Sequence, residues 1–591
     1  MSASLRGVPA QTKTVAEETS APASIPRFLL GLAIALALLA YSEVVRLRFV
    51  YDDAVQIVQN PHLRSWQFLP VYFTRDVWSH AMSHPSNYYR PLFLVWMRLN
   101  YQAFGMNPAG WHAAVLLVHL AVIALVYLLA ARELKDKVTA GFAALLFALH
   151  PIHVESVAWV SGVSEPLMAL LLLGSYLSYL RGREGKGDVW WAAALVLFAM
   201  SLLVKETAMV LPVLIFVREW RWPSTGGEEG KLGRAARRAL PFAALAMAFF
   251  VLHIAVLGSL APAPGNNVRT LAAVAAWPGI VSFYLQKLVW PWPLSLFYAL
   301  PFVTKCGFGN FWLPVLILLG VGSAVWMAAK RSPSAGVACA WLFLPLLPVV
   351  AASVRFERGE LVHDRYLYLP SIGFVMLCAL GLRCLRVGRQ KLFGLPAVQV
   401  AGLLVVACTL GVATAAQSVY WGDNLALYGH TANAAPKSAV AKTMLAQELF
   451  NRGQVPIAMR LYEQALSGDP DDWKVHYAFA LSQMDLRNWP VAEQHLQRFA
   501  QLRPDHPAPL LLLGQVQSEE GKLAQAEASL RRAIALPPLP HGTHYRLAMV
   551  LQQEGKLVEA RQEFKAELAV DPNSDARRRI EDLDREIAGS Q

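Results

Sequence analysis

The chain has 591 residues, of which 55% are hydrophobic and only 16% charged, and its formal net charge is +12. Soluble domains carry about a quarter charged residues, so the composition excludes a wholly soluble protein. Most Lys and Arg flank apolar segments, where they orient membrane proteins, and we therefore do not interpret the positive charge as a sign of nucleic-acid binding. The five cysteines show no spacing typical of a metal site or a disulfide framework.

The N-terminal two-thirds alternates apolar segments with short polar loops. Residues 1–27 are polar and rich in Ala, Ser and Thr, and we expect a disordered cytoplasmic N-terminus. A spanning helix needs about 20 mostly apolar residues. Residues 28–430 are thus expected to form a membrane domain of about eleven spans: 28–46, 109–131, 138–150, 165–181, 188–204, 207–220, 239–260, 311–329, 335–354, 366–386 and 394–416.

Basic residues predict the orientation of these spans. They cluster after every second span, around Arg132, Arg181, Arg218, Lys330 and Arg383, and such clusters stay in the cytoplasm. Loops 47–108, 151–164, 261–310 and 355–365 are then outside. Residues 91–104 and 270–292 are also apolar. If only one of them crossed, the later basic loops would move outside, so we expect both to lie in or partly enter the outer membrane surface.

The C-terminal third, residues 431–591, contains a 34-residue repeat. Small residues recur at 446, 480, 514 and 548 and again at 458, 492, 526 and 560, and prolines close the units at 470, 504, 538 and 572. This pattern is typical of tetratricopeptide (TPR) repeats. The sequence predicts a solenoid of four repeats outside the cytoplasm, with a groove that binds an exported protein or peptide. A scaffold for self-assembly is the alternative.

Several short motifs lie in the predicted outer loops or at their edges. They are Phe49–Asp53, Tyr88–Leu92, Gly105–Pro108, His150–Trp159, Lys205–Glu206 and Asp364–Ser371. In this order, and followed by TPR repeats, they resemble the transmembrane-and-TPR-containing O-mannosyltransferases and their bacterial relatives. The resemblance implies an all-α GT-C glycosyltransferase fold, and transfer of one sugar from a polyprenyl phosphate to a protein Ser or Thr hydroxyl. The family array is usually longer than four repeats.

A hydroxyl that attacks an anomeric carbon needs a general base. The pair Asp52 and Asp53 follows the first span closely, where a lipid-linked donor and a water-borne acceptor would meet. The resemblance assigns the first acidic residue of this loop to the acceptor, so we expect Asp52 to be the base and Asp53 to support it. On the residues alone, a solvated acidic pair is the favoured interpretation, and the resemblance reverses this preference.

The leaving polyprenyl phosphate needs cations near the membrane surface. Arg365, Arg90 and Lys205 stand next to predicted helices, and arginine in particular matches phosphate oxygens. The alternative is interfacial snorkelling of long basic side chains. Glu206 beside Lys205 is either a functional partner or the mark of an exposed helix boundary.

The remaining predicted substrate-binding residues come from the same motifs. His150, His153 and Glu155 include metal-ligand types, but Pro151 interrupts helical spacing and no convincing fourth ligand follows. We therefore favour a donor-pocket role or local hydrogen bonding over a metal, and expect no cofactor beyond the sugar-lipid donor. Glu165 is either part of the pocket or a helix N-terminal acid, and Tyr366 either stacks on sugar or belongs to an aromatic belt. Tyr89 and Asp364 complete the predicted set.

The leading hypothesis is an inverting transferase that moves one sugar, most simply mannose, to an exported protein. The alternatives are a ligase or polymerase of lipid-linked oligosaccharides and a membrane-anchored TPR scaffold without activity. The Ala/Leu/Arg-rich composition favours a bacterial inner membrane, which would place the repeats in the periplasm.

Overall fold

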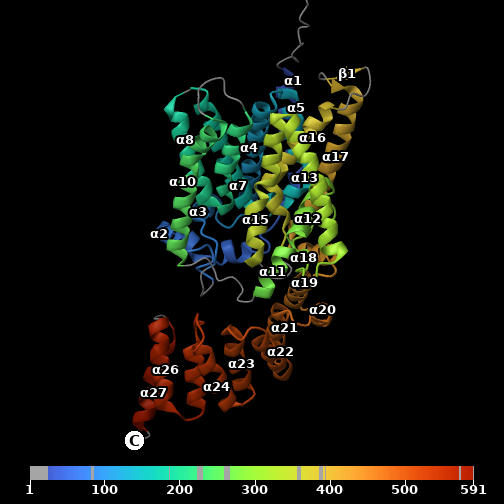
Figure 1. Ribbon diagram of the computed structural model, residues 1–591. Coiled ribbons are helices and arrows are strands. Elements are labelled where there is room, and N and C mark those ends of the chain that lie inside the picture. The colour runs from blue at the N-terminus through green and yellow to red at the C-terminus, as the bar shows by residue number, and fades with distance from the viewer. Residues whose placement is uncertain are drawn as a thin grey trace, which may run out of the picture.

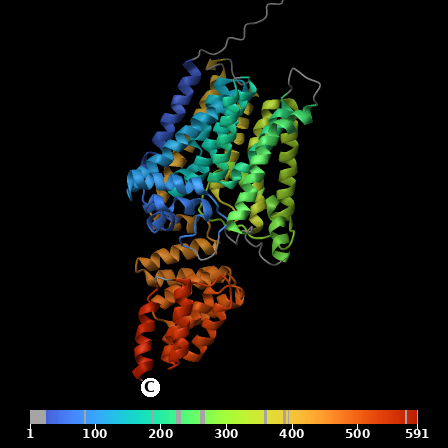
Figure 2. The ribbon, with the colours of Figure 1, turned by 90° about the vertical axis from the view of Figure 1, so that its left-hand side faces the viewer.

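The computed structural model describes residues 24–81, 86–185, 187–222, 230–258, 267–355, 361–384, 390–392, 395–571 and 574–589. A bundle of helices forms one body, and a curved array of shorter helices extends from one end of it (Figures 1 and 2). We call this end the repeat end and the opposite one the basic end. The predicted all-α class is confirmed. Among the described residues, extended pairing is limited to the two-residue strands β1 (Lys391–Leu392) and β2 (Leu395–Pro396).

Eight helical segments of the described chain are long and apolar enough to cross a membrane, or nine if a bent pair counts as one span. The chain is thus an integral membrane protein. The eight segments are Pro108–Leu134 (α4), Val160–Arg183 (ending in α7), Lys231–Leu257 (α10), Thr270–Val289 (α11 and α12), Phe308–Arg331 (ending in α13), Pro333–Arg355 (with α14, Pro333–Phe343, and α15, Leu346–Ala352), Asp364–Arg383 (leading into α16, Tyr368–Cys384) and Ala397–Gly422 (from α17). The bent pair is α5 (Lys137–Leu149) with Pro151–Ala158, which ends in α6 (Val154–Ala158), at 52°.

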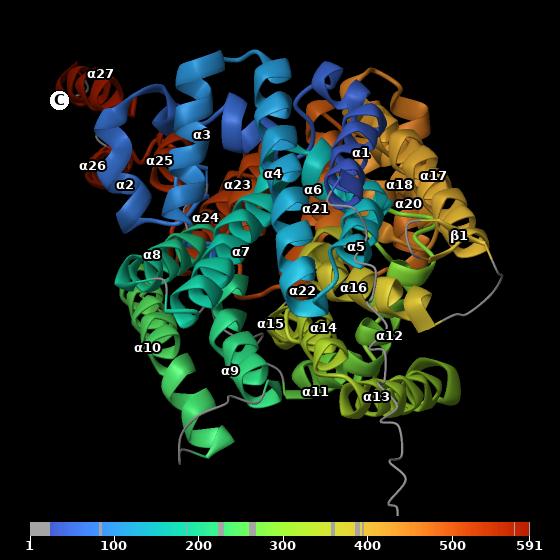
Figure 3. The ribbon, with the colours of Figure 1, turned by 90° about the horizontal axis from the view of Figure 1, so that it is seen from above.

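Two shorter apolar helices, α1 (Ser24–Ala40) and α8 (Asp188–Val204), complete the bundle. Seen along the bundle, α4 and α7 (Ser164–Arg183) lie inside, whereas α10, α13 (Leu313–Arg331) and α17 (Ala397–Val419) lie at the periphery (Figure 3). Burial follows this arrangement, because 72% of the apolar window of Val160–Arg183 is buried but only 6% of that of Phe308–Arg331. Peripheral helices with apolar outer faces are expected where the solvent is lipid.

Of the predicted spans, 28–46 and 188–204 are the shorter helices α1 and α8, and two further segments also differ. The predicted span 207–220 is a short helix, α9 (Leu211–Arg221), which is not among the eight, whereas the apolar segment 270–289 is. That segment is nevertheless divided into α11 (Asn267–Ala275) and α12 (Trp277–Val289), and the chain after α12 turns back. The Val303 amide donates to the Ala272 carbonyl at 3.1 Å, so the returning chain reaches back to α11. The partial entry stays a prediction, because the segment is also long and apolar enough to cross.

Helix α3 (Pro91–Phe104) also belongs to the repeat end. Its 14 residues span about 21 Å, which is shorter than the ~30 Å hydrocarbon core. The preceding loop, with the short helix α2 (Leu69–Thr74), lies along it. Trp66 donates its indole N–H to Gln102 at 2.8 Å, and the Arg98 guanidinium lies 4.7 Å from the Trp66 ring centre.

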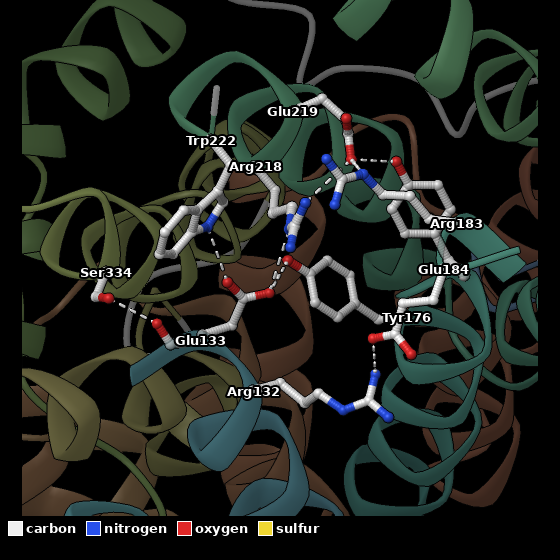
Figure 4. Close-up of polar contacts among 10 residues, drawn as sticks. Arg132, Glu133, Tyr176, Arg183, Glu184, Arg218, Glu219, Trp222 and Ser334 are labelled. Atoms are coloured by element: carbon white, nitrogen blue, oxygen red, sulfur yellow. Dashed lines mark hydrogen bonds and ion pairs between the residues drawn. The ribbon is translucent and has the colours of Figure 1, made fainter. Parts of the chain in front are cut away.

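A buried polar network closes the basic end (Figure 4). Its centres are two fully buried carboxylates, Glu133 of α4 and Glu219 of α9. Each accepts a hydrogen bond from a tyrosine of α7 and pairs with an arginine, over distances of 2.7–3.5 Å. The partners are Tyr176 and Arg218 for Glu133, and Tyr179 and Arg183 for Glu219. Four of the predicted basic clusters meet here. Arg183 and Arg218 represent two of them, and the other two contribute Arg132, which pairs with Glu184, and Arg383, which pairs with Asp136.

The TPR prediction is confirmed by four antiparallel helix pairs and a final helix. The pairs are α19 (Ala439–Asn451) with α20 (Val455–Gly468), α21 (Trp473–Asp485) with α22 (Trp489–Leu502), α23 (Ala508–Glu519) with α24 (Leu523–Ile534), and α25 (Thr543–Gln553) with α26 (Leu557–Val570), followed by α27 (Ala576–Gly589). The repeated small residues lie where helices touch. A Cβ on Gly514 would stand 2.4 Å from Cγ of Leu530, so the contact requires glycine.

Helix α18 (Asn424–Ala434) joins α17 to the first repeat, and the predicted boundary at residue 430 falls inside it. Two predictions lie mostly or wholly outside the described residues: disorder at the N-terminus, where the description begins at residue 24, and the repeat-closing proline at 572.

Candidate active site

The loop after the first helix begins with a tight turn that carries the predicted acids. Tyr51 adopts φ +54°, a left-handed conformation that is unusual for a bulky residue. Its ring packs against Trp159 at 5.5 Å and Phe297 at 6.0 Å between ring centres. Asp52 and Asp53 follow at once. Strained backbone of this kind concentrates at functional sites and persists only where its surroundings hold it.

The two aspartates occupy different environments. Asp53 is fully buried, and its Oδ1 accepts from the amide of Ser161 at 2.9 Å and from the Ser161 hydroxyl, while its Oδ2 accepts from the Val50 amide at 3.3 Å. Burial raises the pKa of the Asp53 carboxyl to about 6, against the lowering effect of these hydrogen bonds. Asp53 thus ties the loop after α1 to the segment that precedes α7. Asp52 is half-buried and lies at the surface of the turn.

Six of the predicted residues form three ion pairs, which we call the polar cluster. Each pair joins one cation to one carboxylate from a distant part of the chain. Arg90 makes two hydrogen bonds to Glu206, at 2.7 and 3.1 Å, and Lys205 contacts Glu165 at 2.5 Å. The third pair is Arg365 with Glu155, where the Arg365 amide also donates to the same carboxylate at 3.0 Å.

Tyr366 connects two of the three pairs of the polar cluster, those of Lys205 and Arg365. The Lys205 ammonium lies 5.4 Å and the Arg365 guanidinium 5.1 Å from its ring centre. Arg365 also lies 5.5 Å from the ring centre of Trp159, the residue that packs on Tyr51. A continuous series of contacts therefore runs from the acidic turn to the polar cluster.

A cavity of about 440 Å³ opens beside the polar cluster. Three cations line it, Arg90, Lys205 and Arg355, against one carboxylate, Glu206. The other walls are mostly apolar and come from the segment after α8, from α10, and from α15 (Leu346–Ala352). They include Met209, Phe249, Phe250, Pro348, Val349 and Ala352. A positively charged head with apolar walls suits an amphipathic anion.

Other predicted residues lie away from this cavity and hold the backbone. Tyr89 is buried behind it and donates its hydroxyl to the Phe73 carbonyl at 3.0 Å. Asp364 accepts from the Tyr298 hydroxyl at 2.8 Å and from the Ser295 amide at 3.3 Å, and so fixes the segment that returns from α12.

The two predicted histidines are also engaged with protein groups. The Ile152 amide donates to Nδ1 of His150, so the proton is on Nε2, which donates to the Leu288 carbonyl at 2.9 Å. His153 is 2.9 Å from the Ser371 hydroxyl. Within the described ranges, no group of three His, Cys, Asp or Glu side chains is arranged to hold a metal ion.

The sequence did not identify much of the cavity wall. Tyr88, next to the predicted Tyr89, faces the cavity and lies under the Arg90 guanidinium at 4.7 Å. Arg355 ends the short helical turn Ser353–Arg355 that follows α15, and His253 belongs to α10. Tyr88 begins the motif Tyr88–Leu92, and this motif was the sequence feature that could have identified it. His253 and the apolar lining residues lie in apolar segments. From sequence, an apolar residue that faces lipid cannot be distinguished from one that faces a cavity.

Comparison with known proteins shows which sequences this chain resembles. Residues 83–224 match the family described as dolichyl-phosphate-mannose-protein mannosyltransferase, and residues 443–575 match tetratricopeptide repeats. Protein O-mannosyl-transferase TMTC3 of Homo sapiens is 24% identical over 83% of this chain and 58% of its own length. Tmtc1 of Drosophila melanogaster is 26% identical over 74% of the chain and 60% of its own length.

Over most of its length the chain is similar to the transmembrane-and-TPR-containing protein O-mannosyltransferases. It spans about 58% of the length of the human relative. The mannosyltransferase match contains five members of the polar cluster, from Arg90 to Glu206, whereas Asp52, Asp53 and Arg365 lie outside it.

Proposed function

We propose that this protein is an inverting GT-C-type glycosyltransferase. It moves a single sugar, mannose, from a polyprenyl phosphate to a Ser or Thr hydroxyl of an exported protein. One observation carries the proposal. The half-buried Asp52, a cavity lined by more cations than carboxylates, and the TPR array all lie at the same end of a membrane bundle.

The cavity suits the donor in both of its parts. The phosphate would lie against Arg90, Lys205 and Arg355, whose charge is only partly balanced by Glu206 within the cavity. Cations at developing phosphate charge are a general way to stabilise a leaving group. The first isoprene units would lie along Phe249 and Phe250 of α10, which face the cavity from the membrane side.

The chemistry needs one displacement at the anomeric carbon. The acceptor oxygen forms a bond to this carbon as the bond to the phosphate oxygen breaks, and the electron pair leaves with the polyprenyl phosphate. Asp52 takes the proton of the hydroxyl. Attack opposite the leaving group inverts the anomeric configuration. Asp53, with both oxygens already engaged, positions the turn instead of taking the proton.

The basic clusters support the orientation of the reaction. Arg132, Arg183, Arg218 and Arg383 gather at the end opposite the repeats, and such residues remain in the cytoplasm. The Asp52 turn and the array would then lie outside, in the periplasm of a bacterium. There the array would capture the acceptor protein or a partner.

The test is transfer by the purified protein in lipid nanodiscs, with polyprenyl-phosphate mannose as donor and a Ser/Thr-rich peptide as acceptor. Mass spectrometry of the peptide is expected to show one added hexose. Addition of a preassembled oligosaccharide would instead identify a ligase, and an unmodified peptide at every donor concentration would leave the chain as a scaffold. Glycoproteomics of a deletion strain against its parent identifies the natural acceptors.

A further inference from the structure

Helix α18 connects the last membrane helix to the first repeat, and it also packs on the acidic turn. The Asn424 side chain of α18 accepts a hydrogen bond through Oδ1 from the Tyr51 amide at 2.9 Å, although the two residues are 373 positions apart. This amide belongs to the residue held at φ +54°. A bond from a distant helix thus stabilises the backbone immediately before Asp52.

The same helix is anchored beneath the turn by aromatic packing. Trp421, just before α18, stacks on Trp159 with 6.2 Å between ring centres, and Trp159 packs on Tyr51. Leu427 and Tyr428 of α18 are buried in one apolar cluster with Val50 of the turn. The strained turn therefore rests on α18 through three kinds of contact.

Helix α18 is in turn fixed to the first repeat. Met444 and Leu445 of α19 pack against the cluster that contains Tyr428. Arg452, just after α19, lies 2.7 Å from Glu448 and 3.8 Å from Asp423, the residue that caps α18.

Tyr428 lies between the two modules. Burial raises the pKa of the Tyr428 hydroxyl, and the charges of Asp52 and Glu448 raise it further. The repeat array is consequently joined to the acidic turn by packed side chains and not by a flexible tether.

We infer that α18 is a positioning element of the active site, in which Asn424 holds Tyr51 in its left-handed conformation and thereby aims Asp52 at the acceptor. This inference rests on the proposed function of Asp52. It implies that the first repeat and the base move as one body, so an acceptor captured by the array is presented to the turn at a fixed place.

Turnover of Asn424→Ala in the full chain tests the inference. Loss of the Oδ1 acceptor is expected to lower kcat about tenfold or more, while KM for polyprenyl-phosphate mannose stays at the wild-type value, because the donor cavity is formed by other elements. Asn424→Asp keeps an acceptor oxygen and is expected to recover most of the turnover. Asn433→Ala, an exposed asparagine near the end of the same helix, is the matched control and is expected to behave as wild type.

A double variant separates positioning from general damage. Glycine adopts positive φ without strain, so Asn424→Ala is expected to lower kcat much less in a Tyr51→Gly background. Hydrogen exchange gives a readout that does not need activity. Amides 50–56 are expected to exchange faster in Asn424→Ala, with segment 203–210 unchanged.

The outcomes distinguish this inference from the proposed function. Wild-type kcat in Asn424→Ala, with Asp52→Asn inactive, overturns the inference alone. Equal losses in kcat and donor affinity, without recovery in Asn424→Asp, also overturn it. Full turnover in Asp52→Asn ends the proposed function. If hydrogen exchange at amides 50–56 is also unchanged in Asn424→Ala, the claim that Asn424 stabilises the turn is overturned as well.

Discussion

Lys205 and Glu165 allow the energetics of the polar cluster to be tested apart from catalysis. Their side chains are 3% and 4% exposed and 2.5 Å apart. Removing one member of a buried pair leaves an uncompensated charge, which costs about 3–5 kcal/mol. Lys205→Met and Glu165→Leu are each expected to destabilise the protein by this amount. The double variant, which leaves no charge, is expected to be near neutral in stability or more stable.

The assay is unfolding in mixed detergent and SDS micelles, with the coupling free energy taken from the double-mutant cycle. The matched control is the pair Arg132 and Glu184, which is 2.9 Å apart but 33% and 42% exposed, and its single variants are expected to cost at most about 1 kcal/mol. If Lys205→Met also costs under about 1 kcal/mol, the pair is solvated and the reasoning fails. The double variant should still bind donor poorly, because Lys205 lines the cavity.

Three further outcomes are expected. Arg355→Ala lowers kcat and raises KM for the lipid donor, because Arg355 lines the cavity in which the leaving phosphate would gain charge; wild-type values of both constants would contradict this. Gly514→Val destabilises the array by about 1–3 kcal/mol, seen as a lower thermal midpoint, because its Cβ meets Leu530; an unchanged midpoint would contradict it. Burial and then His476 lower the pKa of His495 from 6.5 to about 4. The unfolded chain therefore binds the extra proton first, and array stability falls as pH drops from 6.5 toward 4; His495→Gln should flatten this dependence in thermal scans.

The repeat array was predictable because its period is fixed by covalent geometry and packing. Ala446, Ala480 and Ala548 recur at the helix contacts, and all three are fully buried. The membrane bundle was predictable to a lesser degree. Apolar composition identifies a helix but not whether it crosses, so the division of 270–289 into α11 and α12, followed by a return, appears only in the backbone.

The site shows the same limit. Polar residues next to apolar spans, such as Arg90 and Arg365, stand out in the sequence because charge is expensive near lipid. Their partners cannot be identified from the sequence, since Arg365 pairs with Glu155, which is 210 positions away. The sequence also does not distinguish the two adjacent aspartates. Asp53 is buried and hydrogen-bonded, whereas Asp52 is half-buried and lies near the surface.

Hexose transfer by purified Asp52→Asn, measured beside wild type at saturating donor and acceptor, tests the central claim most directly. Loss of a general base is expected to lower kcat about 10²–10⁴-fold, with donor affinity retained and the fold intact, because Asp52 lies outside both the cavity lining and the buried core. Turnover within a few fold of wild type would contradict the account and would place the base elsewhere at the repeat end.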